Sequence, residues 1–163
     1  MERQARNHRG RRGSLREILA DVWFLTRRVR RIRQTYKGNL VPPPLRERLM
    51  LAVVSVYGCR FCSWAHTREA LRSGIEPEEV TQLLCGVMDS CPLEEATAVL
   101  YALHWADSDA RPDPDVVAGL EQTYGPEKAE EIHLILRMNR LGNLTGNTWD
   151  HVLRWASRGR LPR

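Results

Sequence analysis

The chain of 163 residues lacks long hydrophobic runs. No apolar stretch approaches the roughly 20 residues that a helix needs to cross a bilayer, so we expect no membrane span. The charged N-terminus is not followed by the apolar segment of a secretory signal, which favours a cytoplasmic location. Alternation of apolar and polar residues at a period of two is also lacking, so the pattern gives no convincing strand.

Helix signals are abundant instead. Apolar residues recur at helical spacing, and Pro77, Pro92, Pro114 and Pro126 each stand where a first helical residue is expected. The predicted helices cover residues 14–36, 45–57, 59–73, 77–89, 92–107, 114–124, 126–141 and 148–158. With 42% hydrophobic and 28% charged residues, the sequence predicts an all-α, single-domain helical bundle.

The expected organisation has three parts. Residues 1–13 form a disordered basic tail, residues 14–39 an N-terminal helical extension, and residues 40–163 the helical domain. Within that domain, residues 51–56 are rich in β-branched side chains, as a strand would be. They continue the helical spacing that begins at Leu45 and Leu49, so we interpret them as part of a buried helix.

Positive charge is concentrated at the N-terminal end. Residues 1–33 contain eleven arginines and only three acids, which leaves the rest of the chain slightly acidic. A solvated tail and helix face is the simpler interpretation. Such an end could also contact nucleic acid, anionic lipid or an acidic protein partner.

Of four cysteines, two stand close together, at Cys59 and Cys62. We expect Cys85 and Cys91 to be small buried side chains, since neither has a close thiol or histidine neighbour. Inside a reducing compartment, a close pair is more often catalytic or metal-binding than structural. The pair is therefore the first candidate for chemistry.

His66 follows Cys62 by four residues, and a helix turns about 100° per residue, so all three side chains fall within roughly 60° on one face. At a helix N-terminus the free N–H groups would favour the thiolate of Cys59. His66 can accept or return a proton. The spacing predicts a redox site with an attacking thiol, a resolving thiol and a base.

Three alternatives remain for the cysteine pair. The two residues could be inert core, or they could bind zinc with His66 and a fourth ligand. They could also belong to a thioredoxin-like fold, but that fold needs a strand–helix–strand pattern, which we do not find. Glu47, at the head of the preceding helix, is the other unusual residue; the simpler interpretation is a surface acid paired with Arg46 or Arg48.

The same residues resemble a known family. The chain contains Arg46-Glu47, an apolar helix, then Gly58-Cys59-Arg60-Phe61-Cys62-Ser63-Trp64-Ala65-His66, and Gly74 after one more helix. This pattern is similar to the carboxymuconolactone decarboxylase and alkylhydroperoxidase D superfamily, in its branch with the Cys-x-x-Cys-x-x-x-His motif. The spacing of twelve residues between Glu47 and Cys59 also fits. The likeness runs from about residue 40 to 155.

The resemblance implies an all-α enzyme assembled as trimers or hexamers, in which Glu47 and His66 form a proton relay for Cys59 and Cys62. It implies a peroxide or disulfide substrate and a dithiol or thiol protein as reductant. It argues against lactone decarboxylation, because the decarboxylase branch lacks the cysteine pair. Phe61 is a departure, since alkylhydroperoxidase D has a histidine there. No cofactor-binding or metal-binding residue is predicted.

Other polar residues receive structural interpretations. His104 and His133 are expected to be core or interface histidines. Asn139, Arg140, Asn143 and Asn147 are expected near a helix end, where capping and turn chemistry would explain them. The first predicted helix has a wide apolar surface, so we expect residues 14–36 to pack partly across a subunit boundary. The function predicted from the sequence is a thiol-dependent peroxidase or disulfide reductase; the alternative is an oligomeric binding or redox-sensing module with an Arg-rich arm.

Overall fold

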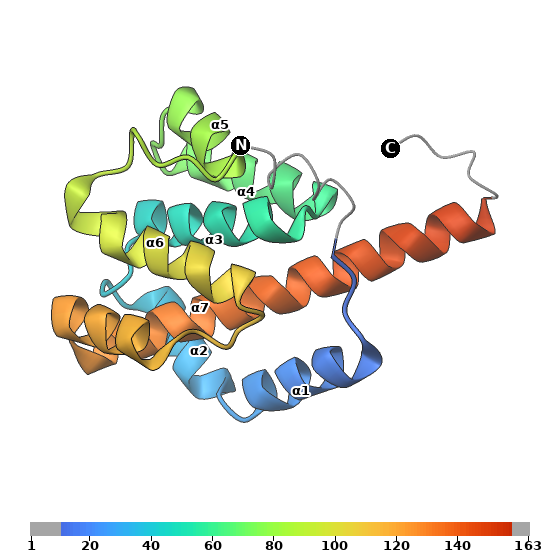
Figure 1. Ribbon diagram of the computed structural model, residues 1–163, viewed down its shortest axis with the longest axis horizontal. Helices are drawn as coiled ribbons and strands as arrows, with labels where there is room; N and C mark the ends of the chain where they lie inside the picture. Colours follow the sequence, from blue (N-terminus) through green and yellow to red (C-terminus); the bar gives the residue numbers. More distant parts are fainter. Residues whose placement is uncertain (1–10, 158–163) are drawn as a thin grey trace.

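A computed structural model describes residues 11–157, and within that range the chain forms seven α-helices and no strand (Figure 1). The helices are α1 (Leu15–Thr26), α2 (Val29–Lys37), α3 (Pro43–Tyr57), α4 (Arg60–Arg72), α5 (Pro77–Leu84), α6 (Leu93–Asp107) and α7 (Pro114–Ala156). The all-α prediction is confirmed. Of the basic tail predicted for residues 1–13, residues 1–10 lie outside the described residues.

Helix α3 forms the centre of the molecule. It packs against α4, α5, α6 and α7, and its residues from 47 to 54 are all buried. A helix enclosed in this way must be apolar over most of its circumference, which explains the run of β-branched residues at 51–56. The interpretation of that run as buried helix is confirmed.

The predicted starts of several helices agree with the structure. Ser14 and Glu17 form the expected reciprocal capping box at α1. Pro77 and Pro114 occupy the first turns of α5 and α7, where a missing N–H leaves no hydrogen bond unmade. Helix α3 begins at Pro43, two residues earlier than predicted, with Pro42 as its N-cap and Pro43 and Pro44 in its first turn.

The single helix predicted for residues 14–36 is wrong. The chain bends at Arg27 and Arg28, and two helices, α1 and α2, pack separately along α7. No proline or glycine marks this bend. Stacking supports it, because the ring of Phe24 lies under the guanidinium of Arg28, 3.8 Å from the ring centroid, and under that of Arg137, at 4.4 Å.

The two helices predicted for residues 126–141 and 148–158 are one. After a kink at Gly125, where φ is 77° and ψ 160°, helical backbone continues without a break through residues 142–147 to Ala156. The kink falls where the sequence predicts it, between residues 124 and 126. Glycine alone adopts that backbone conformation easily, so the break has a local cause.

Tertiary hydrogen bonds explain why α7 continues through the predicted turn. Asn139 donates from its side-chain amide to the carbonyl of Met50, at 2.7 Å, and Asn147 donates to the carbonyl of Tyr57, at 2.9 Å. Asn143 lies between them and donates to Asn139. The prediction that these residues cap a helix end is therefore wrong, because they form a buried polar row in the middle of a helix.

Arg140 extends the same polar row toward the N-terminal helices. Its guanidinium hydrogen-bonds Asp21 of α1, Glu17 of α1 at 3.2 Å and the hydroxyl of Tyr57 at 3.1 Å. Asp21 is almost fully buried, and its carboxylate also accepts a hydrogen bond of 2.9 Å from the guanidinium of Arg137. These contacts join α1 to α7 and to the end of α3.

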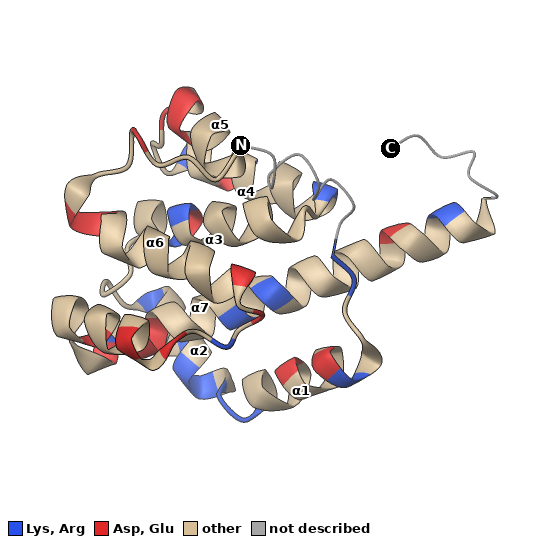
Figure 2. Ribbon diagram, in the orientation of Figure 1, with Lys and Arg blue, Asp and Glu red and all other residues tan. Residues whose placement is uncertain are grey.

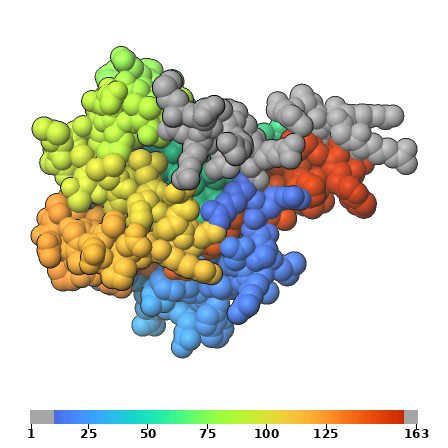
Figure 3. All heavy atoms as spheres, viewed as in Figure 1, coloured from blue at the N-terminus to red at the C-terminus, as the bar shows by residue number. Residues whose placement is uncertain are grey.

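The last turns of α7 extend beyond the other helices in the ribbon view (Figure 1), and atoms of α7 form one edge of the molecule in the space-filling view (Figure 3). Trp149, Val152 and Trp155 lie on this part of the helix and are exposed. Among the described helices, none combines the length and the apolar character that a membrane-spanning segment would need.

Candidate functional site

A tight turn after α3 places the first cysteine. Gly58 ends α3 in the left-handed conformation, with φ of 65°, and Cys59 follows as the N-cap of α4. The sulfur of Cys59 accepts a hydrogen bond from the backbone N–H of Cys62, at 3.3 Å. Cys59 therefore lies at a helix N-terminus, as predicted. A negative sulfur at this position is stabilised by the helix dipole.

The two thiols differ in exposure and in acidity. Cys59 is fully buried, whereas Cys62 is partly exposed. The pKa of Cys59 is lowered to about 7, chiefly by the hydrogen bond from the Cys62 thiol and by backbone N–H donors of residues 61 and 62, against the opposing effect of burial. The pKa of Cys62 is raised because its thiol donates to Cys59 and because it is partly buried. Negative charge therefore gathers on Cys59.

Glu47 and His66 meet one helical turn from Cys62. The carboxylate of Glu47, on α3, lies 3.0 Å from Nδ1 of His66, one turn beyond Cys62 on α4. Glu47 is buried, so the interpretation of Glu47 as a surface acid is wrong. Its second oxygen lies 3.6 Å from Nε of Arg46. A carboxylate that orients a histidine is the usual arrangement of a proton-transfer pair.

Arg48 fixes the helix that carries Glu47. Its guanidinium lies in the core and binds Glu79 of α5 through two hydrogen bonds, of 2.6 and 3.1 Å, and Glu95 of α6 at 3.0 Å. Such a buried bidentate pair holds its partners in one geometry. The two arginines that flank Glu47 therefore have separate partners: Arg46 lies next to Glu47 itself, and Arg48 connects α3 to α5 and α6.

Helix α7 forms the back of the cysteine site, which the sequence did not lead us to expect. Gly146 faces the pair so closely that a methyl group in place of its hydrogen would lie 2.7 Å from the sulfur of Cys59. Asn147 holds the Tyr57 carbonyl in the preceding turn, and Asp150 lies 2.8 Å from the guanidinium of Arg60. The spacing of four between Asn139, Asn143 and Asn147 could have indicated one helix face.

The remaining candidates lie elsewhere. His133 is half-buried and hydrogen-bonds the hydroxyl of Tyr101 at 2.9 Å, and His104 accepts from the backbone N–H of Asp113 at 3.3 Å, so both have structural partners. Cys91 is buried, as predicted. Cys85 is exposed, so the prediction for Cys85 is wrong: it follows the last residue of α5, where the chain turns at the surface.

The zinc interpretation finds no support in residues 11–157. That part of the chain brings together no group of three or more His, Cys, Asp or Glu side chains that could hold a metal ion. Cys59 and Cys62 are both free thiols.

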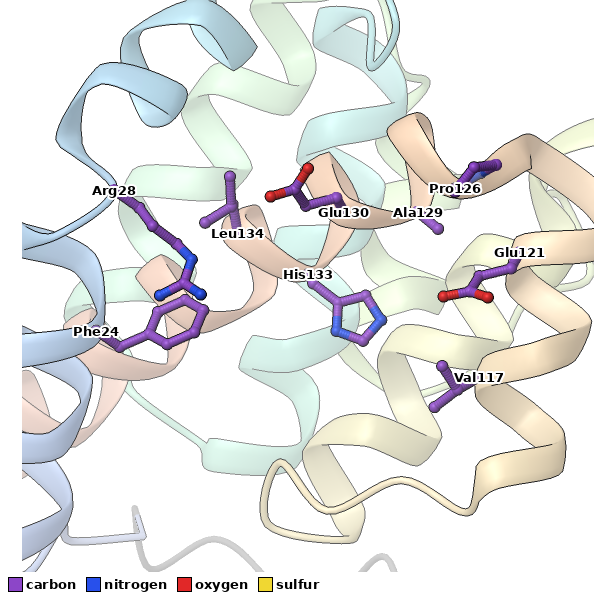
Figure 4. A pocket seen from close by; sticks show the side chains of 9 residues that line it. All are labelled: Phe24, Arg28, Val117, Glu121, Pro126, Ala129, Glu130, His133 and Leu134. Carbon is purple, nitrogen blue, oxygen red and sulfur yellow. The ribbon is translucent and has the colours of Figure 1, made fainter.

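A hollow of about 260 Å³ lies away from the cysteines, between the bend after α1 and the kink of α7 (Figure 4). Phe24 and Arg28 form one side, and Glu121 and His133 project from the two parts of α7. None of the four residues predicted for the redox site lines it. Burial, with help from the positive charge of Arg137, lowers the pKa of His133.

Figure 2 shows arginine positions in blue before α1 and along α2, and several of these arginines contact other parts of the fold. Arg31 lies 3.2 Å from Glu130 and 3.7 Å from Glu127, both at the start of the long part of α7. Arg11 pairs with Asp109, and Arg28 stacks on Phe24. These contacts give part of the positive charge a structural explanation.

The family model of the carboxymuconolactone decarboxylase family matches residues 25–108, which is more than half of the chain and includes Glu47, Cys59, Cys62 and His66. The chain belongs to this family. Membership agrees with the all-α fold and with the resemblance noted from the motif, and it suggests an alkylhydroperoxidase-like function with which the cysteine pair is consistent. The chain has no significant match among curated proteins or solved structures. The matched region ends before α7, so the back of the site lies outside it.

Proposed function

We propose that the protein is a thiol-dependent peroxidase that cycles Cys59 and Cys62 between dithiol and disulfide. The observation that carries the proposal is the N-cap position of Cys59, which gives a buried sulfur with a lowered pKa next to a second, partly exposed thiol. Inert core cysteines have raised pKa values, as Cys91 does through burial. The acidity of Cys59 therefore favours a reactive pair.

The difference in exposure suggests the order of events. Cys62 is the thiol that a peroxide can reach, so we assign it the attack on the peroxide. Its proton leaves through His66, which Glu47 orients from 3.0 Å. Cys59, buried and already stabilised as a thiolate, then acts as the resolving thiol.

The chemical balance is that of a two-electron reduction. As His66 takes the proton of the Cys62 thiol, the Cys62 sulfur attacks the outer oxygen of the hydroperoxide and becomes a sulfenic acid. The O–O bond breaks, and the departing alkoxide takes that proton back from the relay to become an alcohol. The Cys59 thiolate then attacks the sulfur of the Cys62 sulfenic acid, an S–S bond forms, and hydroxide leaves and is protonated to water. A dithiol reductant returns the disulfide to two thiols and is itself oxidised.

Phe61 affects how protons reach the site. It occupies the position between the cysteines where alkylhydroperoxidase D has a histidine, and its ring is exposed and lies 4.8 Å from the guanidinium of Arg60. A phenylalanine carries no proton, so the relay in this chain depends on Glu47 and His66. We accordingly expect Glu47→Gln to lower the peroxidase rate about 10²-fold or more.

Peroxide consumption tests the proposal. Full-length protein is mixed with an alkyl hydroperoxide and dithiothreitol, and wild type is compared with Cys59→Ser, Cys62→Ser and Cys85→Ser. Both variants of the pair should lose turnover, while Cys85→Ser, a matched exposed cysteine, should keep it. Full turnover in either variant of the pair would contradict the mechanism.

Trapping of the sulfenic acid tests which cysteine attacks the peroxide and which resolves it. After one addition of peroxide without reductant, Cys59→Ser should accumulate a sulfenic acid on Cys62, which dimedone traps and mass spectrometry detects. Cys62→Ser should form far less adduct, because the remaining sulfur is buried. The reverse pattern would exchange the roles of the two cysteines.

A further inference from the structure

The back of the cysteine site is a single face of α7. Gly146, Asn147 and Asp150 lie within about one turn of that helix, and each contacts the turn or the first residues of α4. Asn147 also donates to the carbonyl of Arg11 at 2.8 Å, so the turn is held from behind by a fixed amide. The cysteine motif alone therefore does not determine where the sulfur of Cys59 lies.

Gly146 determines how much space that sulfur has. An added β-carbon at this position would lie 2.7 Å from the sulfur of Cys59 and 3.9 Å from that of Cys62. The first separation is far shorter than a normal contact between carbon and sulfur, so one of the two groups would have to move. Helix α7 is anchored by its buried polar row, and the thiol is the more easily displaced partner.

Asp150 brings a buried negative charge to the same place. It pairs with Arg60, the residue next to Cys59, at 2.8 Å and with Arg154 at 2.5 Å, and its charge disfavours a negative sulfur at Cys59. The other ionisable group that acts on the pKa of Cys59 is Cys62 on α4. Tyr57 and Arg11, which hold the turn before Cys59, pair with each other, since the Arg11 backbone N–H donates to the Tyr57 carbonyl and the Arg11 guanidinium lies 5.5 Å from the Tyr57 ring centroid.

We propose that Gly146 and Asp150 are positioning residues for Cys59 that act in opposite senses. Gly146 leaves the space in which the sulfur meets the N–H groups at the start of α4, and Asp150 limits the negative charge that gathers there. The proposal rests on the proposed function, in that it takes Cys59 to be a working thiol. It extends the site to a helix that the family match does not include.

The balance has a chemical use. A thiolate that is stabilised too strongly is a weak nucleophile, and an attacking thiol works best when its pKa is close to the ambient pH. The hydrogen bond from the Cys62 thiol and the N–H groups at the start of α4 favour the thiolate, and burial and the carboxylate of Asp150 oppose it. The pKa of Cys59 that results is about 7.

The test measures the pKa of Cys59 directly, through the pH dependence of alkylation by iodoacetamide and of thiolate absorbance at 240 nm. The protein is full-length with Cys85→Ser, which removes the exposed thiol. Trypsin cleaves after Arg48, Arg60 and Arg68, so Cys59 and Cys62 fall in different peptides and mass spectrometry follows each thiol separately. The absorbance measurement requires no access to the buried sulfur.

Gly146→Ala should raise the pKa of Cys59 by about one unit, because the displaced sulfur loses N–H donors. Gly142→Ala is the matched control: it lies one turn earlier on the same helix, its β-carbon would meet nothing within 4 Å, and it should leave the pKa unchanged. Asp150→Asn should lower the pKa by about half a unit, since a like charge is removed and Arg60 remains. Asp107→Asn, an exposed acid at the end of α6, controls for net charge, and Asp150→Glu should return the pKa toward wild type.

Opposite shifts distinguish positioning from simple structural support. If Asp150 only held the turn together, Asp150→Asn would loosen the N-cap and raise the pKa, as Gly146→Ala does, and the proposal would be wrong. Equal values for Gly146→Ala and Gly142→Ala would also overturn it. If Gly146→Ala fails to fold by circular dichroism, the direction of the Asp150→Asn shift alone decides. Opposite shifts in a protein without peroxide turnover would uphold the positioning of Cys59 and refute the proposed peroxidase.

Discussion

Removal of Arg140 should destabilise the protein strongly, because it leaves a buried carboxylate short of its partner. Asp21 has only 1% of its surface exposed and is bound by Arg140 and by Arg137, the latter at 2.9 Å. Truncation of one partner of a buried pair costs about 3–5 kcal/mol. Since Arg137 remains, we expect Arg140→Met to lower the free energy of unfolding by about 3 kcal/mol, near the lower end of that range.

A double-mutant cycle measures the interaction itself. Asp21→Asn removes the buried charge, so Arg140→Met should cost less in that background, and we expect a coupling energy above about 1.5 kcal/mol. The assay is urea unfolding followed by far-ultraviolet circular dichroism at a fixed protein concentration. Arg72→Met is the matched control: Arg72 forms an exposed pair with Glu69 at 2.7 Å, which should contribute less than about 1 kcal/mol.

Two results would refute this reasoning. A loss below about 1 kcal/mol in Arg140→Met would mean that Asp21 is adequately satisfied by Arg137, and that the guanidinium of Arg140 adds little. Additive effects in the cycle would mean that the arginine stabilises through its other contacts, with Glu17 and the hydroxyl of Tyr57.

Three further predictions concern pH, assembly and the kink. Because the pKa of Cys59 is lower in the folded protein than in the unfolded chain, its thiolate stabilises the fold fully above the unfolded pKa, and this stabilisation is lost as pH falls through about 7. The free energy of unfolding of wild type relative to Cys59→Ser should therefore rise between pH 7 and 9. A difference that does not change with pH would contradict the N-cap explanation. Leu15 and Leu19 on α1 are 76% and 60% exposed, and exposed apolar side chains of this kind mark contacts between subunits. We expect the wild type to form a trimer or hexamer and the double variant Leu15→Ser, Leu19→Ser to form a smaller species in light scattering. A wild-type monomer at micromolar concentration would refute the assembly. Gly125→Ala should lower the free energy of unfolding by about 1–3 kcal/mol because φ there is 77°, whereas Gly119→Ala, in open space, should not, and equal unfolding curves for the two would refute this.

Local signals predicted most of the helical architecture. The capping box at Ser14 and the prolines at the starts of α5 and α7 act through groups only a few residues apart, so the sequence contains the whole cause. The cysteine motif was visible for the same reason, since Cys59, Cys62 and His66 lie within two turns of α4. Family resemblance added Glu47, whose contact with His66 spans two helices.

The errors have tertiary causes. Asparagine and glycine favour turns in short peptides, and residues 142–147 therefore looked like a break. In the structure, carbonyls of α3 and the turn after it accept the side-chain amides of Asn139 and Asn147, which outweighs the local preference. The bend at Arg28 and the approach of Gly146 to Cys59 likewise depend on residues about 110 and 90 positions away in the sequence.

The N-cap position of Cys59 makes one atom both a reagent and part of the helix framework. Once that sulfur is bonded to Cys62 it bears no negative charge, so it becomes a weaker acceptor for the amide of Cys62, and the first turn of α4 should exchange its amide hydrogens faster in the oxidised protein. The choice of inactive variant follows from the same fact. Serine is a good N-cap residue, and alanine at the same position makes a helix less stable by about 1 kcal/mol. Cys59→Ser therefore removes the redox chemistry but keeps the N-cap of α4, whereas Cys59→Ala removes the redox chemistry and the N-cap.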